Sequence, residues 1–162
     1  MEHVRTLLDR VILTVCCGLF ITMVMAASWQ VISRYALNSP STISEAFLRF
    51  SLVWMSMIAI AYVAGLREHV SLTLFIDKLD GLWKVMLEIS IEILFIFFAV
   101  FVMIYGGTQA AYNTMSQIYP MLGIPKGVLY MSLPVSGSII VIYCLMNCQQ
   151  ILQDSYSFRS QS

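Results

Sequence analysis

The sequence predicts an all-α membrane protein with four transmembrane helices, a short interfacial amphipathic helix and both termini in the cytoplasm. Of its 162 residues, 59% are hydrophobic and only 11% are charged, whereas soluble domains carry about 25% charged residues. The mean hydropathy of +0.82 agrees with this composition. Four apolar windows approach the roughly 20 residues that a helix needs to cross the hydrocarbon layer.

The predicted spans cover residues 11–32, 47–66, 85–105 and 128–148, within a single membrane domain of residues 1–162. The first span follows Arg5 and Arg10 and could be mistaken for a secretory signal. Its apolar run is longer than the roughly 7 to 15 residues of a signal-peptide core, and it lacks a clear small-x-small cleavage site. We therefore expect this span to be retained.

Polar and aromatic residues mark the connection between the first two spans. Trp29, Arg34 and Tyr35 are of the kind that anchors a helix end at the headgroup level. Thr42-Ile-Ser-Glu45 has the spacing of a capping box at the start of the next helix. Glu45 and Arg49 are four residues apart with the acid first, the better order for an ion pair on one helical face.

The connector between the second and third spans has helical periodicity over residues 71–84, with charged residues at the positions that the apolar ones leave. This pattern predicts a short amphipathic helix lying in the interface. A plain solvated connector is the alternative, and Gly81 weakens the helix prediction.

Two carboxylates open the third span. Glu88 lies four residues after Lys84 and is expected to form a structural pair with it. Glu92 lies a turn deeper, inside a strongly apolar run. It is either a proton or ion site or a carboxylate that pairs with a basic residue on a neighbouring helix or reaches interfacial water. Pairing is the preferred interpretation, because acids inside a membrane pair wherever they can.

Small residues on the second and fourth spans allow helices to approach closely. They are Ala61 and Gly65 on the second span, and Ser132, Ser136, Gly137 and Ser138 on the fourth. They would serve contacts with another membrane protein or packing within this chain. Pro134 is expected to kink the fourth helix.

The distribution of Lys and Arg predicts the orientation of the chain. The side that carries both termini holds six of them, Arg5, Arg10, Arg67, Lys78, Lys84 and Arg159, and the other side holds three, Arg34, Arg49 and Lys126. Both termini are therefore placed in the cytoplasm.

Several function classes find little support in the sequence. The basic residues are scattered, so no nucleic-acid footprint is expected. With only two histidines, the paired axial ligands of a membrane dihaem cytochrome are missing. The alternatives that stay open are a self-sufficient four-helix cation exporter using Glu92 and a quinone-linked membrane thiol oxidoreductase. The latter would need reactive cysteine pairs, whereas Cys16, Cys17, Cys144 and Cys148 all lie in apolar runs.

Four groups of residues together resemble the small membrane subunit (Q-type, DctQ-like) of tripartite ATP-independent periplasmic (TRAP) transporters. The matching positions are Trp29, Gln30, Val31, Arg34 and Tyr35; Pro40, Glu45, Arg49 and Trp54; Arg67, Glu68 and His69; and Gly123, Pro125, Tyr130, Leu133 and Pro134. Ile43 stands where a Trp is common, and Ala46 replaces the second residue of an acidic pair. These departures bear on any role that needs the full acidic pair, not on the family.

The resemblance implies a non-catalytic subunit in a sodium-driven importer of the bacterial inner membrane. In that family a large membrane subunit moves a carboxylate solute and sodium ions by an elevator movement, and a periplasmic binding protein delivers the solute. The small subunit would enlarge the stationary scaffold, and it would hold no cofactor, because the sodium ions belong to the partner subunit. We further hypothesise that Arg34, Glu45 and Arg49 form a network at the periplasmic rim. Arg67 and His69 would anchor the cytoplasmic rim. A local surface pair and ordinary snorkelling are the respective alternatives.

Overall fold

The computed structural model describes residues 2–37, 41–66 and 82–159. Four helical stretches within these ranges are long and apolar enough to cross a membrane, which confirms the predicted fold class. They are Val4–Tyr35, Thr42–Gly65, Val85–Thr114 and Gly127–Ile151. The helical elements are α1 (Glu2–Tyr35), α2 (Thr42–Gly65), α4 (Leu82–Phe98), the π-helix η1 (Ala99–Gly106), α5 (Gly107–Thr114), α6 (Gly127–Tyr130) and α7 (Ser132–Arg159).

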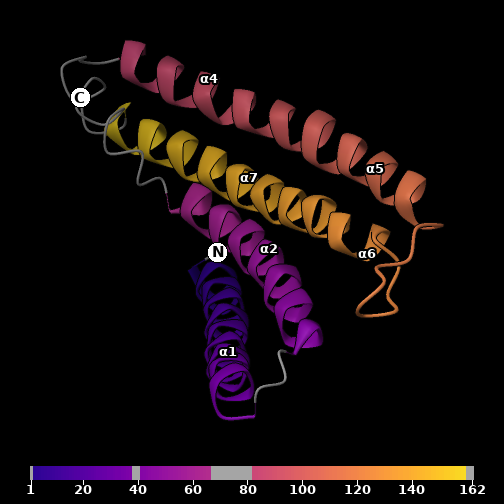
Figure 1. Cartoon of the computed structure of the whole chain (residues 1–162). Helices are drawn as coiled ribbons and strands as arrows, with labels where there is room; N and C mark the ends of the chain where they lie inside the picture. The colour runs from indigo at the N-terminus through magenta and orange to yellow at the C-terminus, as the bar shows by residue number, and fades with distance from the viewer. Residues whose placement is uncertain (1, 38–40, 67–81, 160–162) are drawn as a thin grey trace.

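The helices form two antiparallel pairs (Figure 1). The continuous rod of α4, η1 and α5 lies along α7, and α1 lies along α2. The two pairs are joined by contacts between α2 and α7. Among the described helices, α2 is the only one whose backbone comes close to that of α1. The first helix is therefore peripheral, and most of its surface faces outward.

The start of α2 differs from the predicted capping box by one residue. Ser41 is the N-cap, and its hydroxyl accepts a hydrogen bond from the Ser44 backbone N–H at 3.4 Å. Glu45 therefore lies one position beyond the box and is available to pair with Arg49. The prediction that Thr42 caps the helix was wrong because Ser41 and Thr42 both carry a suitable hydroxyl, and spacing alone does not choose between adjacent candidates.

The third helix extends past its predicted span into residues that were expected to form a connector. It passes from α4 through η1 into α5 and ends at Thr114. Gly107, a poor helix former, is buried where a Cβ would lie 2.7 Å from Leu133 Cβ. Close packing against α7 thus stabilises a helix that local propensity disfavours.

The fourth span is divided into α6 and α7 at Met131. Pro134 lies in the first turn of α7, where its missing N–H costs little. The proline therefore accompanies a break at the start of the helix.

All but one of the small residues predicted on the second and fourth spans are buried within the chain, and the exception is Ser138, which is exposed. Ala61 is fully buried together with Ala99, Met103, Ile140 and Cys144 in a core between α2, the third helix and α7. At Gly137 a Cβ would lie 2.8 Å from Met103 Cβ. Here α7 meets η1 at a distance that a larger residue would prevent.

The predicted interfacial helix over residues 71–84 falls mostly outside the described residues, which resume at Leu82 as part of α4. Arg67 and His69 lie outside them too. The interfacial helix and the cytoplasmic placement of both termini remain predictions.

Candidate functional site

Polar side chains from three helices and a backbone carbonyl from a fourth meet at one end of the bundle. We call this group the polar junction. Its members are Arg5 and Asp9 of α1, the carbonyl of Gly65 on α2, Glu92 of α4, and Tyr143, Asn147 and Gln150 of α7. It lies near the start of α1, at the end of α2 and along the middle of α7, toward the end of the bundle that carries the termini.

Glu92 and Asn147 link the third and fourth helices inside the bundle. Asn147 Nδ2 donates to Glu92 Oε1 at 3.1 Å and approaches the Gly65 carbonyl oxygen at 3.5 Å. Asn147 is fully buried, and Glu92 is 9% exposed. Polar groups of this kind are costly in a membrane unless they bond to each other. The contact joins two helices by directional bonds and also reaches the backbone of α2.

Arg5 connects α1 to two other helices at once. Its Nη1 donates to Gln150 Oε1 at 2.9 Å, and its Nη2 donates to the Gly65 carbonyl at 3.1 Å. Tyr143 provides a second link, since its hydroxyl donates to Asp9 Oδ1. The backbones of α1 and α7 do not pack together. Side chains therefore hold the peripheral helix to α7, through these hydrogen bonds and through the apolar cluster that Ile12 shares with Tyr143.

Gly65 is the position that lets these groups meet. A Cβ there would lie 2.4 Å from Tyr143 Cγ, 2.6 Å from Cδ1 and 2.7 Å from Cδ2. The Tyr143 ring thus lies directly against the backbone of α2, and its hydroxyl reaches Asp9. The predicted small-residue motif at Ala61 and Gly65 has this role in the structure.

The chemistry of the junction is that of a structural tie. Each of the hydrogen bonds described above joins different helices, and the carboxylates of Asp9 and Glu92 accept hydrogen bonds from neutral groups of α7. Among the described residues, no three His, Cys, Asp or Glu side chains come close enough together to hold a metal ion. Of the four cysteines, Cys16 and Cys17 lie on α1, and Cys144 and Cys148 lie on α7.

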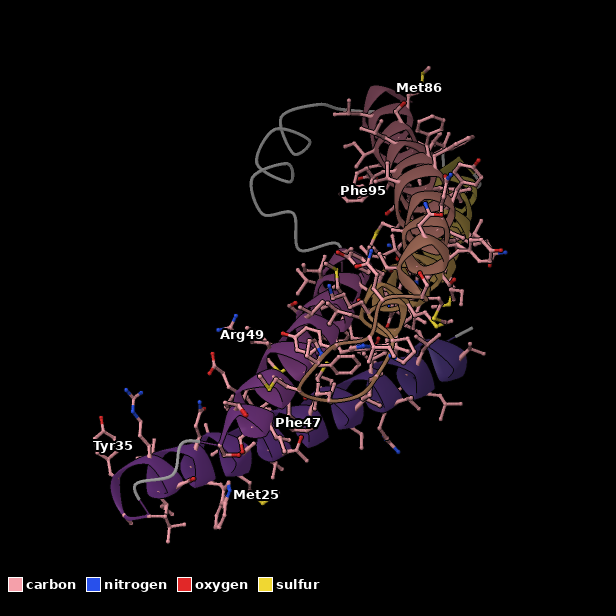
Figure 2. All side chains as sticks on the ribbon, turned by 45° about the vertical axis from the view of Figure 1, so that its right-hand side comes forward. Met25, Tyr35, Phe47, Arg49, Met86 and Phe95 are labelled. Atoms are coloured by element: carbon pink, nitrogen blue, oxygen red, sulfur yellow. The ribbon has the colours of Figure 1, made fainter. Side chains whose placement is uncertain are left out.

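The opposite end of the bundle carries the predicted rim residues. Glu45 and Arg49 form an ion pair, with both side chains more than half exposed. Within the described part of the chain, no hydrogen bond or ion pair links Arg34 to either of them. Trp29 and Tyr35 are 54% and 76% exposed. Figure 2 shows Tyr35 at the far end of α1 and Arg49 projecting from α2.

Two further predicted residues lie within the bundle. Trp54 is half-buried, 6.4 Å from the Phe50 ring, and packs against the core of Ile12, Ile58 and Tyr143. Its indole Nε1 is buried without a partner among the described residues. Glu88 is half-buried on α4, and the side chain of Lys84, its predicted partner, lies outside those described.

Sequence reasoning identified Glu92 but missed the other side chains of the junction. Arg5 and Asp9 are four residues apart on one face of α1, and Asn147 and Gln150 are three apart on α7. Both spacings are visible in the sequence and place polar groups on a common face. The residues were missed because they lie near the ends of hydrophobic runs, where polar residues are ordinary.

Comparison with known proteins agrees with this architecture. The model of the family described as "Tripartite ATP-independent periplasmic transporters, DctQ component" matches residues 23–154. The chain is 26% identical over 141 residues to the sialic acid TRAP transporter small permease protein SiaQ of Vibrio cholerae, covering 87% of this chain and 81% of the relative. It is 19% identical over 140 residues to a putative TRAP transporter small permease protein of Haemophilus influenzae, covering 86% of each. With four spanning helices, it is a multi-pass protein of the bacterial inner membrane. This chain belongs to the DctQ family and is a small permease component of a TRAP transporter.

Proposed function

We propose that this chain is the non-catalytic small subunit of a sodium-coupled importer of a carboxylate solute. It braces the large elevator-type membrane subunit, which carries the solute and the sodium ions, and a periplasmic binding protein delivers the solute. Membership of the DctQ family supports a role within a tripartite transporter. The name of the Vibrio relative mentions sialic acid, which is a carboxylate. From this name we infer only the chemical class of the solute, a carboxylate, for the transporter that contains this chain.

The polar junction is the observation that carries the bracing role. Its hydrogen bonds connect all four spanning helices at one end. A brace needs helices that do not slide past one another, and bonds between helices in a membrane resist such sliding. The buried Glu92 is part of this tie, and its hydrogen bond with Asn147 supports a structural role for the carboxylate.

The outward faces of α1 and the third helix supply surface for lipid and for the large subunit. On α1, Phe20, Ile21 and Met25 are each more than half exposed, and on the third helix Phe97 and Phe101 are too. A larger apolar perimeter resists tilting of a moving partner in the bilayer. We assign contacts with the large subunit to these faces.

Reconstitution tests the proposal directly. Liposomes that contain this chain together with the large subunit and binding protein are expected to accumulate a carboxylate when a sodium gradient is applied. Liposomes that contain this chain alone are expected to accumulate nothing. Uptake by the isolated chain would overturn the proposal, and so would full uptake by the large subunit and binding protein without it.

Glu92→Gln separates a structural tie from an ion carrier. Glutamine keeps an oxygen that accepts from Asn147 Nδ2, so uptake by the complete system is expected to stay within about twofold of the parent, since the side-chain tie survives. A carboxylate that carries a proton or cation cannot be replaced by an amide, and its loss would abolish uptake. Asn147→Leu is the paired variant. It removes the donor and is expected to lower stability by about 1 kcal/mol.

The exposed residues of the opposite rim are proposed to receive the binding protein. Arg34, Glu45 and Arg49 form this surface, with Trp29 and Tyr35 as interfacial anchors. Arg49→Glu is expected to reduce uptake while the chain still reaches the membrane. The double variant Glu45→Arg/Arg49→Glu keeps an ion pair with the charges exchanged. If the double variant recovers uptake, Glu45 and Arg49 form only a local ion pair and do not contact the binding protein.

Arg67 and His69 are proposed to anchor the cytoplasmic rim against the large subunit. Replacing both with alanine is expected to release the large subunit during purification in mild detergent. Arg10→Gln is a suitable control, because Arg10 is an exposed basic residue at the end that carries the termini. A complex that survives the double alanine change but not the control change would contradict this assignment.

A further inference from the structure

A hollow of about 90 Å³ opens between α2 and the connector that joins α5 to α6. From α2 it is lined by Ala46, Phe50 and Val53, and from the connector by Tyr119, Leu122 and Ile124. Pro125 and, from α6, Leu129 extend the apolar lining, and two basic residues, Arg49 and Lys126, also line the hollow. The hollow is thus an apolar cleft bordered by positive charge, and it is separate from the polar junction at the other end of the bundle.

The connector has a defined backbone that holds its side chains over α2. Lys126 N–H donates to the Gln117 carbonyl at 2.8 Å, and Tyr119 N–H donates to the Ile124 carbonyl at 2.9 Å. Gly123 turns the chain with a φ of 64°, which glycine adopts without strain. Figure 1 shows this connector folding back beside the first turns of α2. The wall of the hollow is therefore a formed structural element.

The ends of three spans around the hollow lead us to expect it at the depth where lipid headgroups meet acyl chains. Three spans end or begin around it: α2 begins at Thr42, the third helix ends at Thr114, and α6 begins at Gly127. Interfacial tyrosines and basic residues occupy this level of a membrane, and Tyr119, Arg49 and Lys126 all border the hollow.

The charges at the border leave one positive charge without an acidic partner. Arg49 and Lys126 contribute two positive charges, and Glu45, which pairs with Arg49, contributes one negative charge. The Lys126 ammonium donates to the neutral Gln117 Oε1 at 3.3 Å, and no ion pair to Lys126 occurs among the described residues. A single phosphodiester would balance the remaining charge.

From this combination we propose that the hollow binds an anionic phospholipid from the surrounding leaflet. One acyl chain enters between Phe50 and Leu122, and the phosphate binds the Lys126 ammonium. An acyl chain suits the apolar lining, and the phosphodiester suits the unpaired cation. The bound lipid would join α2 to the connector at the end of the bundle that the polar junction does not reach. This inference depends on membrane embedding and not on the proposed transport role.

Native mass spectrometry of the delipidated full-length chain in mild detergent tests the proposal. Titration with palmitoyl-oleoyl phosphatidylglycerol is expected to give one tightly retained lipid, and the zwitterionic phosphatidylcholine of the same chains is expected to bind more weakly. Lys126→Gln is expected to weaken retention of phosphatidylglycerol by about fivefold, while Lys126→Arg retains it. Arg34→Gln is the matched control, since it removes a basic charge at the same end but away from the hollow, and it is expected to leave retention unchanged.

Two further arms identify the source of the phosphate and the role of the cleft. Ala46→Phe places a ring in the hollow and is expected to displace the lipid. Glycerol 3-phosphate, which has no acyl chain, is expected not to compete. The proposal is overturned if Lys126→Gln binds phosphatidylglycerol as the parent does, or if glycerol 3-phosphate displaces the lipid. It is also overturned if Lys126→Gln weakens capture of the large subunit while lipid retention is unchanged.

Discussion

Replacing Gly65 with alanine tests whether close contact between α2 and α7 holds the bundle together. The added Cβ would lie 2.4 Å from Tyr143 Cγ, and the other two nearest atoms are also ring carbons of Tyr143. These atoms lie at the base of the ring and cannot move aside by a change at the tip of the side chain. The two helices must separate, or the ring must rotate out of its site.

The expected cost is that of overpacking, about 1–3 kcal/mol. Separation also lengthens the contacts from Arg5 and Asn147 to the Gly65 carbonyl and withdraws Tyr143 from Asp9. In membranes such hydrogen bonds contribute about 0.6 kcal/mol each on average. We therefore expect Gly65→Ala to lower the unfolding free energy by an amount in the upper half of this range.

Unfolding in mixed micelles with increasing dodecyl sulfate measures this cost. Trp54 packs against the core that contains Tyr143, so tryptophan fluorescence is a suitable signal. Gly18→Ala is the matched control, because a Cβ at Gly18 meets nothing within 4 Å. The double variant Gly65→Ala/Tyr143→Ala removes the clashing ring and is expected to lose less stability than the sum of its single changes. Equal stability of the Gly65 and Gly18 variants would refute the reasoning.

Two further predictions concern the N-cap of α2 and the hydrogen bond between Tyr143 and Asp9. Ser41→Ala is expected to lower the unfolding free energy by about 1 kcal/mol in the same assay, because it removes the N-cap. Thr42→Ala is expected to leave the unfolding free energy nearly unchanged. If Thr42→Ala costs more than Ser41→Ala, the capping box predicted from the sequence would be correct. Tyr143→Phe removes only the hydroxyl that donates to Asp9 and is expected to cost about 0.5–1.5 kcal/mol. Cysteine crosslinking between α1 and α7 in that variant should show a looser α1, and an unchanged crosslinking rate would mean that α1 is held by other contacts.

Composition and hydropathy were enough to identify this chain as a helical membrane protein. Hydropathy is a sum over neighbouring residues, so four spans could be recognised without knowing how they pack. The ion pair of Glu45 and Arg49 could also be predicted, because both residues lie four positions apart on one helix. The position of the N-cap could not be predicted in this way, because Ser41 and Thr42 are adjacent and both carry a hydroxyl group that can cap the helix.

Which polar side chains meet could not be predicted without the packing of the helices. Asn147 and Glu92 are 55 positions apart, and Tyr143 and Asp9 are 134 apart. Whether such residues meet depends on the rotation of each helix about its axis and on how closely the helices approach. Those quantities are set by contacts such as Gly65 against Tyr143, which belong to pairs of helices and leave no trace in the hydropathy of either one.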